Sequence, residues 1–307
     1  MPARQEAPQF DTAFRVFIPS SLVAVALLGP FPWSIPLPVQ LSLLLASVVL
    51  LGLPHGALDG VLLRNSRYWP QRNGPASFLL GYVLLAALVV ILWWQFPVPA
   101  LALFLAISAV HFSGDFQPAP VWARLPGGAL IILLPIAFHP DEVAGLFAAI
   151  SGPQAMSLAE MLALPPAFMA LLLAAAFIPA RGRRTATAVE LLVLATLAWV
   201  APPLVYFAIY FCCLHSLRHF QRSWHKTPTA SRPRLWKEAA IYTLLSILGG
   251  VAAGIWLFQR ASVEVVVLEV VFIGLAALTV PHMLIIALAG PRPERPSPQA
   301  HSPARIC

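Results

Sequence analysis

Residues 203–222 read PLVYFAIYFCCLHSLRHFQR, an apolar run long enough to cross a lipid bilayer as an α-helix. No charged residue occurs in it before Arg218. The run is continuous, whereas a strand of a membrane β-barrel alternates apolar and polar residues. This stretch therefore predicts a membrane-spanning helix, and it carries two histidines, His215 and His219.

Similar apolar runs occur along the rest of the chain. Breaks at Pro, Gly and charged residues divide it into about ten candidate spans. These are approximately 14–31, 38–62, 77–96, 99–113, 127–147, 161–179, 186–200, 203–222, 237–258 and 264–289. Two of them, 99–113 and 186–200, are shorter than the ~20 residues of a perpendicular span. The sequence predicts an all-α, polytopic transmembrane helical bundle of about 8 to 10 spanning or half-spanning helices.

The composition agrees with this class. Of 307 residues, 59% are hydrophobic and 10% are charged, whereas about a quarter of a soluble domain is charged. The net charge of +7 does not indicate nucleic-acid binding, because Arg and Lys lie mainly in short loops. No P-loop or Gly-rich dinucleotide motif occurs. We therefore expect membrane lipid around the protein and no nucleic-acid partner.

The positions of the basic residues predict the topology. With ten spans and a cytoplasmic N-terminus, every Arg and Lys except Arg260 faces the cytoplasm. Both termini are therefore expected to be cytoplasmic, in a bacterial inner (plasma) membrane. Residues 1–290 are predicted to form a single integral-membrane domain. The Pro-rich residues 291–307 are predicted to form a disordered cytoplasmic tail.

Five histidines lie within or at the ends of the apolar runs, namely His55, His111, His215, His219 and His282. An ionisable ring at membrane depth is costly unless it binds something. Imidazole is also a favoured ligand of iron, zinc and copper. In the ten-span topology all five rings fall within about ten ångströms of one layer. Their recurrence predicts a shared transition-metal site inside the membrane.

The spacing of His215 and His219 supports this site. Residues at i and i+4 stack on one face of a helix. The same spacing lets two imidazoles reach one metal ion in helical zinc sites. In an apolar span, the alternative is two rings without partners in hydrocarbon.

Two further histidines each begin the pattern His-x-x-x-Asp, which pairs His55 with Asp59 and His111 with Asp115. A carboxylate can accept the second ring N–H of a ligating histidine, which fixes the tautomer and raises the basicity of the ring. Each aspartate is open to serve its own histidine or one on a facing helix. An aspartate within a span costs ~2.5 to 3.5 kcal/mol. We therefore predict that Asp59 contributes to catalysis and that Asp115 either supports the site or lies at the membrane interface.

His282 follows Pro281, which is expected to free a backbone carbonyl within its span. Three roles remain open for His282: a fifth ligand, a residue of a substrate pocket, or a ring bonded to that carbonyl. Aromatic residues flank the histidines, and Phe112 and Phe211 are candidates to line a hydrophobic pocket.

At these strings the sequence resembles the Brp/Blh family of membrane-embedded β-carotene 15,15′-dioxygenases. The resemblance rests on PHGALD at 54–59, HFSGD at 111–115 and YFCCLHSLRH at 210–219, with PH at 281–282 as a weaker element. It covers the chain from about residue 50 to 290, and the order and spacing of the strings are specific in combination. The first 35 residues and the tail are not matched.

The resemblance implies an enzyme that depends on Fe²⁺ held by His55, His111, His215 and His219. It implies that O2 cleaves the central double bond of β-carotene and that two molecules of all-trans-retinal form. Because the family is associated with microbial rhodopsins, it also implies a functional link to a retinal-binding rhodopsin.

Three other classes of protein are weighed against the dioxygenase. One is a non-catalytic carotenoid-binding or opsin-assembly factor, which product formation would distinguish from an enzyme. A di-iron desaturase or hydroxylase needs several histidine boxes such as HxxHH, and this chain offers one HxxxH. A metal or proton transporter with a His/Asp relay is expected to show inverted repeats. The two His-x-x-x-Asp strings hint at duplication, but His215 and His219 have no counterpart.

Overall fold

The structure is a computed structural model that describes residues 11–29, 35–56, 59, 75–116, 119–177, 184–226, 229 and 232–288. These residues form α-helices joined by short π- and 3₁₀-helical segments, and no strand occurs among them. The prediction of an all-α helical bundle is confirmed. The predicted tail, 291–307, lies outside the described residues.

The helices follow one another with few long connections. In chain order they are α1 (Thr12–Leu28), α2 (Leu37–Ser47), η1 (Val48–Gly52), α3 (Leu53–Gly56), α5 (Pro75–Gln95), α6 (Pro97–Phe112), η2 (Ser113–Phe116), α7 (Val121–Phe138), α8 (Pro140–Ser151), η3 (Pro153–Ala155), α9 (Met156–Leu162), α10 (Pro166–Phe177), α11 (Arg184–Val200), α12 (Pro203–Ile209), η4 (Tyr210–Ser216), α13 (Leu217–Lys226), α14 (Arg232–Leu257) and α15 (Val263–Leu288).

Five of the described helices are long and apolar enough to cross a membrane: Ser77–Gln95, Pro97–Phe116, Val121–Phe138, Leu235–Leu257 and Val263–Ala287. The bent pair Pro153–Leu162 and Pro166–Phe177 provides a sixth if it counts as one span. Large apolar side chains stay exposed on the outer helices, as contact with lipid requires. The chain is therefore an integral membrane protein.

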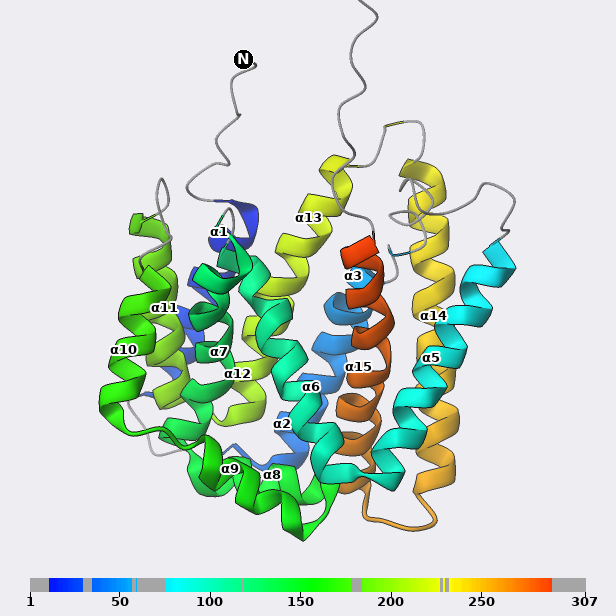
Figure 1. The fold of residues 1–307 in the computed structure, drawn as a ribbon, viewed down its shortest axis with the longest axis horizontal. Helices are drawn as coiled ribbons and strands as arrows, with labels where there is room; N and C mark the ends of the chain where they lie inside the picture. The colour runs from blue at the N-terminus through cyan, green and yellow to red at the C-terminus, as the bar shows by residue number, and fades with distance from the viewer. Residues whose placement is uncertain are drawn as a thin grey trace, which may run out of the picture.

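One expected span differs in the structure. The apolar run at 127–147 belongs to two helices, because α7 ends at Phe138 and α8 begins at Pro140. Proline favours the first position of a helix and has no N–H to continue the preceding one. The His139 ring lies 3.0 Å from the Ala198 carbonyl oxygen and fixes this corner to α11. The second helix, α8, then crosses the base of the bundle (Figure 1).

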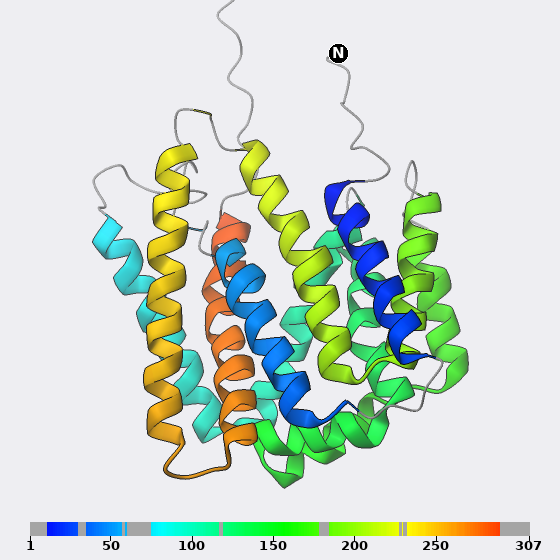
Figure 2. The ribbon, with the colours of Figure 1, turned by 180° about the vertical axis from the view of Figure 1, so that it is seen from behind.

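α15 runs through the middle of the bundle and contacts α2, α5, α6, α8 and α14. On one side of it stand α5 and α14, and on the other side stand α1, α7, α10 and α11 (Figure 1). The beginning of α1 and the end of α15 lie at the same end of the bundle, opposite α8 and α9 (Figure 2). This arrangement agrees with termini on one side of the membrane.

Glycine lets α6 and α7 pack closely beside the end of α6. A Cβ atom at Gly128 would lie 2.0 Å from the Ala109 carbonyl oxygen and 2.6 Å from the Ser113 nitrogen. At the neighbouring Gly127 it would lie 2.7 Å from the Phe116 ring. These contacts hold η2, which begins two residues after His111, against α7.

Candidate functional site

Four buried or half-buried imidazoles come together from three regions that are distant in sequence. His111 lies in the last turn of α6, His215 and His219 lie in the consecutive segments η4 and α13, and His282 lies in α15. The ring centroids of His111 and His215 lie 4.5 Å apart, those of His111 and His282 5.0 Å, and those of His219 and His282 4.9 Å. We call these four residues the imidazole cluster.

The closest contact in the cluster joins His111 and His215. Their Nε2 atoms face each other at 2.9 Å. The His215 ring stands in the π-helical turn Tyr210–Ser216, and such wider turns occur often at functional sites. A second π-helical turn, η1, packs against it, and a Cβ atom at Gly52 would lie 2.8 Å from the Phe211 ring.

Asp115 supports His215 from across the bundle. Its Oδ2 atom lies 3.0 Å from His215 Nδ1 and accepts a 2.8 Å hydrogen bond from the Tyr210 hydroxyl. A carboxylate can only accept, so Nδ1 of His215 carries a proton and Nε2 presents its lone pair in the neutral ring. Asp115 is buried. The structure therefore places its carboxylate inside the bundle, next to His215.

Asp59 and His282 repeat the same arrangement. The Asp59 Oδ1 atom lies 2.6 Å from His282 Nδ1, and both side chains are buried. The Tyr82 hydroxyl lies 3.3 Å from the second carboxylate oxygen and donates a 3.0 Å hydrogen bond to the Leu278 carbonyl. Each aspartate thus pairs with a histidine on a facing segment. Tyr82 and Tyr210 were not singled out in the sequence. The signal that could have found them is a tyrosine within an apolar run, since its hydroxyl needs a partner there.

His55 cannot be placed in the cluster, because its side chain lies outside the described residues. Its helix, α3, contacts α13 and α15, which carry His219 and His282. The neighbouring residues Leu53 and Gly56 line the cavity described below. Among the described side chains, which exclude that of His55, no three of His, Cys, Asp or Glu form a ready metal site.

Arg218 joins the cluster to the rest of the fold. Its side chain is 2% exposed. The guanidinium lies 2.9 Å from Asp11 and 2.7 Å from Glu190, and it donates a 3.1 Å hydrogen bond to the Asp115 carbonyl. Arg222, one turn further, donates to the Gly114 carbonyl at 2.8 Å. These bonds fix the η2 turn against α13, between His111 and His215.

Replacement of Arg218 by methionine is expected to destabilise the protein by about 3 to 5 kcal/mol, because it leaves the Glu190 carboxylate buried without its cation. Thermal unfolding in detergent would measure this loss. Arg260→Met is the matched control, since Arg260 is exposed and stacks on Trp256 at 3.9 Å. If the two variants unfold at the same temperature, the Arg218 network does not hold the fold together.

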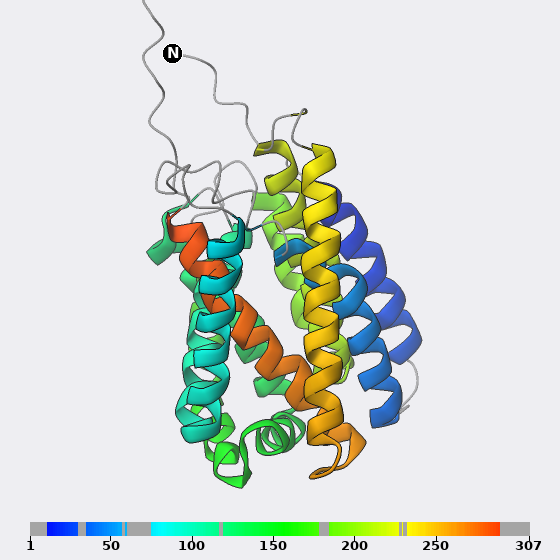
Figure 3. The ribbon, with the colours of Figure 1, turned by 90° about the vertical axis from the view of Figure 1, so that its right-hand side faces the viewer.

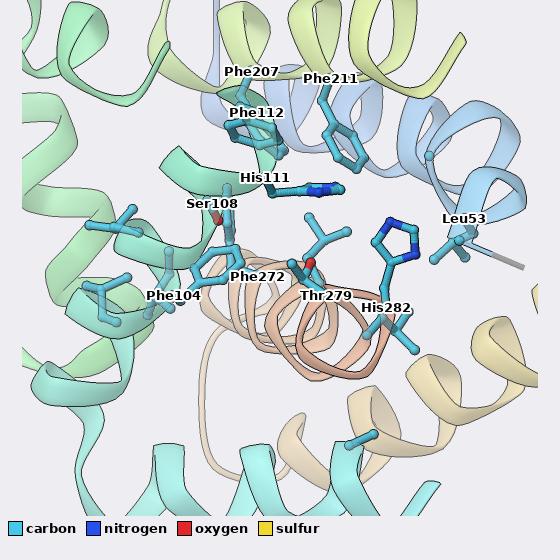
Figure 4. A pocket seen from close by; sticks show the side chains of 18 of the residues that line it. Leu53, Phe104, Ser108, His111, Phe112, Phe207, Phe211, Phe272, Thr279 and His282 are labelled. Carbon is cyan, nitrogen blue, oxygen red and sulfur yellow. The ribbon is translucent and has the colours of Figure 1, made fainter. Parts of the chain in front are cut away.

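A cavity of about 450 Å³ adjoins the cluster and has mainly apolar walls. His111, His282 and Asp59 line it, and so do Phe112 and Phe211. Figure 4 shows His111 and His282 turned toward the same space, with Phe112 and Phe211 on one side and Ser108, Phe272 and Thr279 on the other. The Phe211 ring also stacks on His215, with centroids 5.6 Å apart. The cavity therefore offers apolar space next to the imidazoles.

A membrane bundle that buries an imidazole cluster beside an apolar cavity defines a membrane-embedded enzyme with a histidine-centred site. Residues 46–289 match the family model described as "Beta-carotene 15,15'-dioxygenase". The match covers most of the chain, which therefore belongs to the β-carotene 15,15′-dioxygenase family, as the sequence strings indicated.

Relatives of this family agree over most of the chain. A protein of the uncultured marine bacterium 66A03, named "Beta-carotene 15,15'-dioxygenase", is 36% identical over 254 residues, which cover 79% of this chain and 91% of the relative. A protein of Halobacterium salinarum, named "Probable beta-carotene 15,15'-dioxygenase Blh", is 28% identical over 214 residues, or 59% of this chain and 61% of the relative. No solved structure matches the chain.

Proposed function

We propose that this chain cleaves the central double bond of β-carotene with O2 to give two molecules of all-trans-retinal, and that it uses Fe²⁺. The observation that carries the proposal is the imidazole cluster beside an apolar cavity inside a membrane bundle, in a chain of this family. β-Carotene dissolves in the bilayer, so an apolar cavity within the bundle suits it.

The donor atoms fit iron. Two nitrogens that bind one ion at about 2.1 Å and at a right angle lie about 3 Å apart, and the Nε2 atoms of His111 and His215 lie 2.9 Å apart. Imidazole suits iron as a ligand. His55, His111, His215 and His219 are the proposed ligands. His282 is a further candidate, because Asp59 holds its Nδ1 as Asp115 holds that of His215.

The bound iron would supply O2 activation, and the protein's own residues would prepare the site. Asp115 with Tyr210 and Asp59 with Tyr82 orient two imidazoles and keep their Nδ1 atoms protonated. The apolar walls exclude water and hold the polyene against the cluster. In the overall reaction one C=C bond breaks, two C=O bonds form, and each aldehyde receives one oxygen atom. The reaction is balanced without a reductant.

The orientation in the membrane and the use of the product are further parts of the proposal. We infer cytoplasmic termini from the charge distribution along the chain. Retinal released into the membrane would serve a retinal-binding rhodopsin.

Expression in a bacterium that accumulates β-carotene tests the activity. The orange colour is expected to fade in air, and retinal is expected to appear in lipid extracts analysed by chromatography. Cells grown without O2, and cells that express the His215→Ala variant, should stay orange. A culture that keeps its colour although the wild-type protein is present in the membrane would contradict the proposed function.

A further inference from the structure

The cavity beside the imidazole cluster is closed at one end. Its walls there come from α6, α7, α8 and α12, whose lining side chains are buried or half-buried. Leu101, Ile136, Val143, Ile150 and Leu204 are each no more than 5% exposed. The helix α8 crosses the base of the bundle (Figure 1). Because its residues line the cavity, α8 forms the floor of the cavity.

The other end opens between α5 and α14. Val83 and Ala87 on α5 and Leu245 on α14 line the cavity and are also exposed, Val83 by 53% and Leu245 by 45%. A residue that contributes to both surfaces marks the rim of an opening. We call these three residues the rim.

Aromatic pairs join the two helices on either side of the rim. Phe78 contacts Tyr242 with centroids 6.2 Å apart, and Trp94 contacts Trp256 at 5.4 Å. The rim residues lie between these pairs in both helices. Figure 3 shows α5 and α14 as separate outer helices with α15 crossing between them. Because both helices are apolar membrane spans, the opening faces lipid hydrocarbon.

The depth of the closed part can be measured along its walls. The lining runs from Leu101 to His111 on α6 and from Phe272 to His282 on α15. Each interval spans ten residues, which is about 15 Å of α-helix. One retinal unit in its extended form has a similar length. The closed part therefore accommodates one half of β-carotene when the central bond lies at the histidines.

We propose that the cavity is a one-ended polyene site that is loaded from the membrane between α5 and α14. One half of the substrate fills the closed part down to α8, and the other half stays in the opening. The distance from the floor to the imidazole cluster then selects the bond that is cleaved. This inference rests on the proposed function and adds the binding direction and the residues that set the cleavage position.

A smaller cavity depth should move the cleavage position. In Val143→Phe the floor rises, the polyene penetrates less deeply, and a bond away from the centre lies at the cluster. The expected products are two aldehydes of unequal length, identified by chromatography and mass spectrometry, at the expense of retinal. Ala144→Val, on the same helix and outside the cavity lining, should give retinal alone. Retinal as the only product of an active Val143→Phe enzyme would overturn the role of the floor.

Bulky substitutions at the rim should block the entry of β-carotene without affecting the fold, because the side chains that they replace are exposed. Leu245→Trp and Ala87→Trp are expected to slow β-carotene uptake from lipid nanodiscs about tenfold. Uptake is followed by the absorbance change of the bound polyene under argon, so the readout does not depend on cleavage. Their neighbours Leu244 and Leu88 are 55% and 48% exposed and do not line the cavity. Leu244→Trp and Leu88→Trp are therefore the matched controls.

The outcomes distinguish a failure of this inference from a failure of the proposed function. If the wild type forms retinal and both rim variants take up β-carotene as fast as their controls, the opening between α5 and α14 is not the route, and the inference is overturned. If the wild type forms no retinal in air, the proposed function itself fails. Slow uptake in both rim variants, together with normal uptake in both controls, supports the inference.

Discussion

His111→Ala and His215→Ala are each expected to lose bound iron and retinal formation together, with activity falling by more than about 100-fold. These two rings present Nε2 atoms 2.9 Å apart, so removal of either leaves the facing nitrogen without the neighbour that would share its metal ion. His219→Ala and His55→Ala are expected to behave in the same way as members of the proposed ligand set. Iron per chain and retinal formed would be measured on the same purified samples.

The matched control is His225→Ala, since His225 lies exposed on α13, the helix that carries His219. That variant should keep both its iron and its activity. Normal iron content in one of the variants at His55, His111, His215 or His219 removes that residue from the proposed ligand set. Normal iron in both His111→Ala and His215→Ala would rule out the proposed metal site. His282→Ala decides whether His282 is a ligand: loss of iron would make it one, whereas retained iron would make it a residue of the substrate pocket.

The second large effect is expected at the two buried carboxylates. Asp115→Asn and Asp59→Asn should each lower iron affinity or turnover by about 10 to 100-fold. The amide can still accept the Nδ1–H bond, but it lacks the negative charge that raises the basicity of His215 or His282. Iron affinity by competition with a chelator, turnover and thermal unfolding would be measured in parallel.

A merely structural role predicts a different pattern. If the carboxylates only help folding, the thermal stability of the variants falls while the iron affinity of the folded protein stays unchanged. Asp141→Asn is the control, because Asp141 is exposed in the first turn of α8. Wild-type turnover in Asp59→Asn would leave Asp59 with a packing role alone.

The sequence predicted the helical membrane class and a site built from histidines, and there is a clear physical reason for both predictions. Apolar runs of span length determine the class, and ionisable rings within them are too costly to be incidental. The family strings around His55, His111 and His215 also indicated where the site lies in the chain. The comparisons then placed the chain in that family over residues 46–289, and this membership favours the dioxygenase over a transporter or a di-iron desaturase.

The sequence could not predict which aspartate pairs with which histidine on a distant segment. Asp115 precedes His215 by 100 residues, and Asp59 precedes His282 by 223. The spacing His-x-x-x-Asp left open which histidine each carboxylate serves, since that choice depends on how η2 packs against η4 and how Asp59 lies against α15. The same holds for Tyr82 and Tyr210, whose hydroxyl groups meet the carboxylates only in the folded bundle.

The break between α7 and α8 shows a second limit of sequence patterns. Apolar residues flank the short polar stretch 139–142 on both sides, and the sequence prediction joined them into one span at 127–147. Pro140 ends that continuity, and α8 becomes the floor of the cavity and not part of a span. The cavity itself is lined by residues of ten of the described helical segments, and no local pattern in the sequence predicts its closed and open ends.

The metal content of the protein purified without O2 tests the central claim most directly. About one iron per chain is expected in the wild type, with the ion absent from His111→Ala and His215→Ala purified in the same way. A wild-type protein that converts β-carotene to retinal but holds no iron, or that keeps its iron in both variants, would contradict the account.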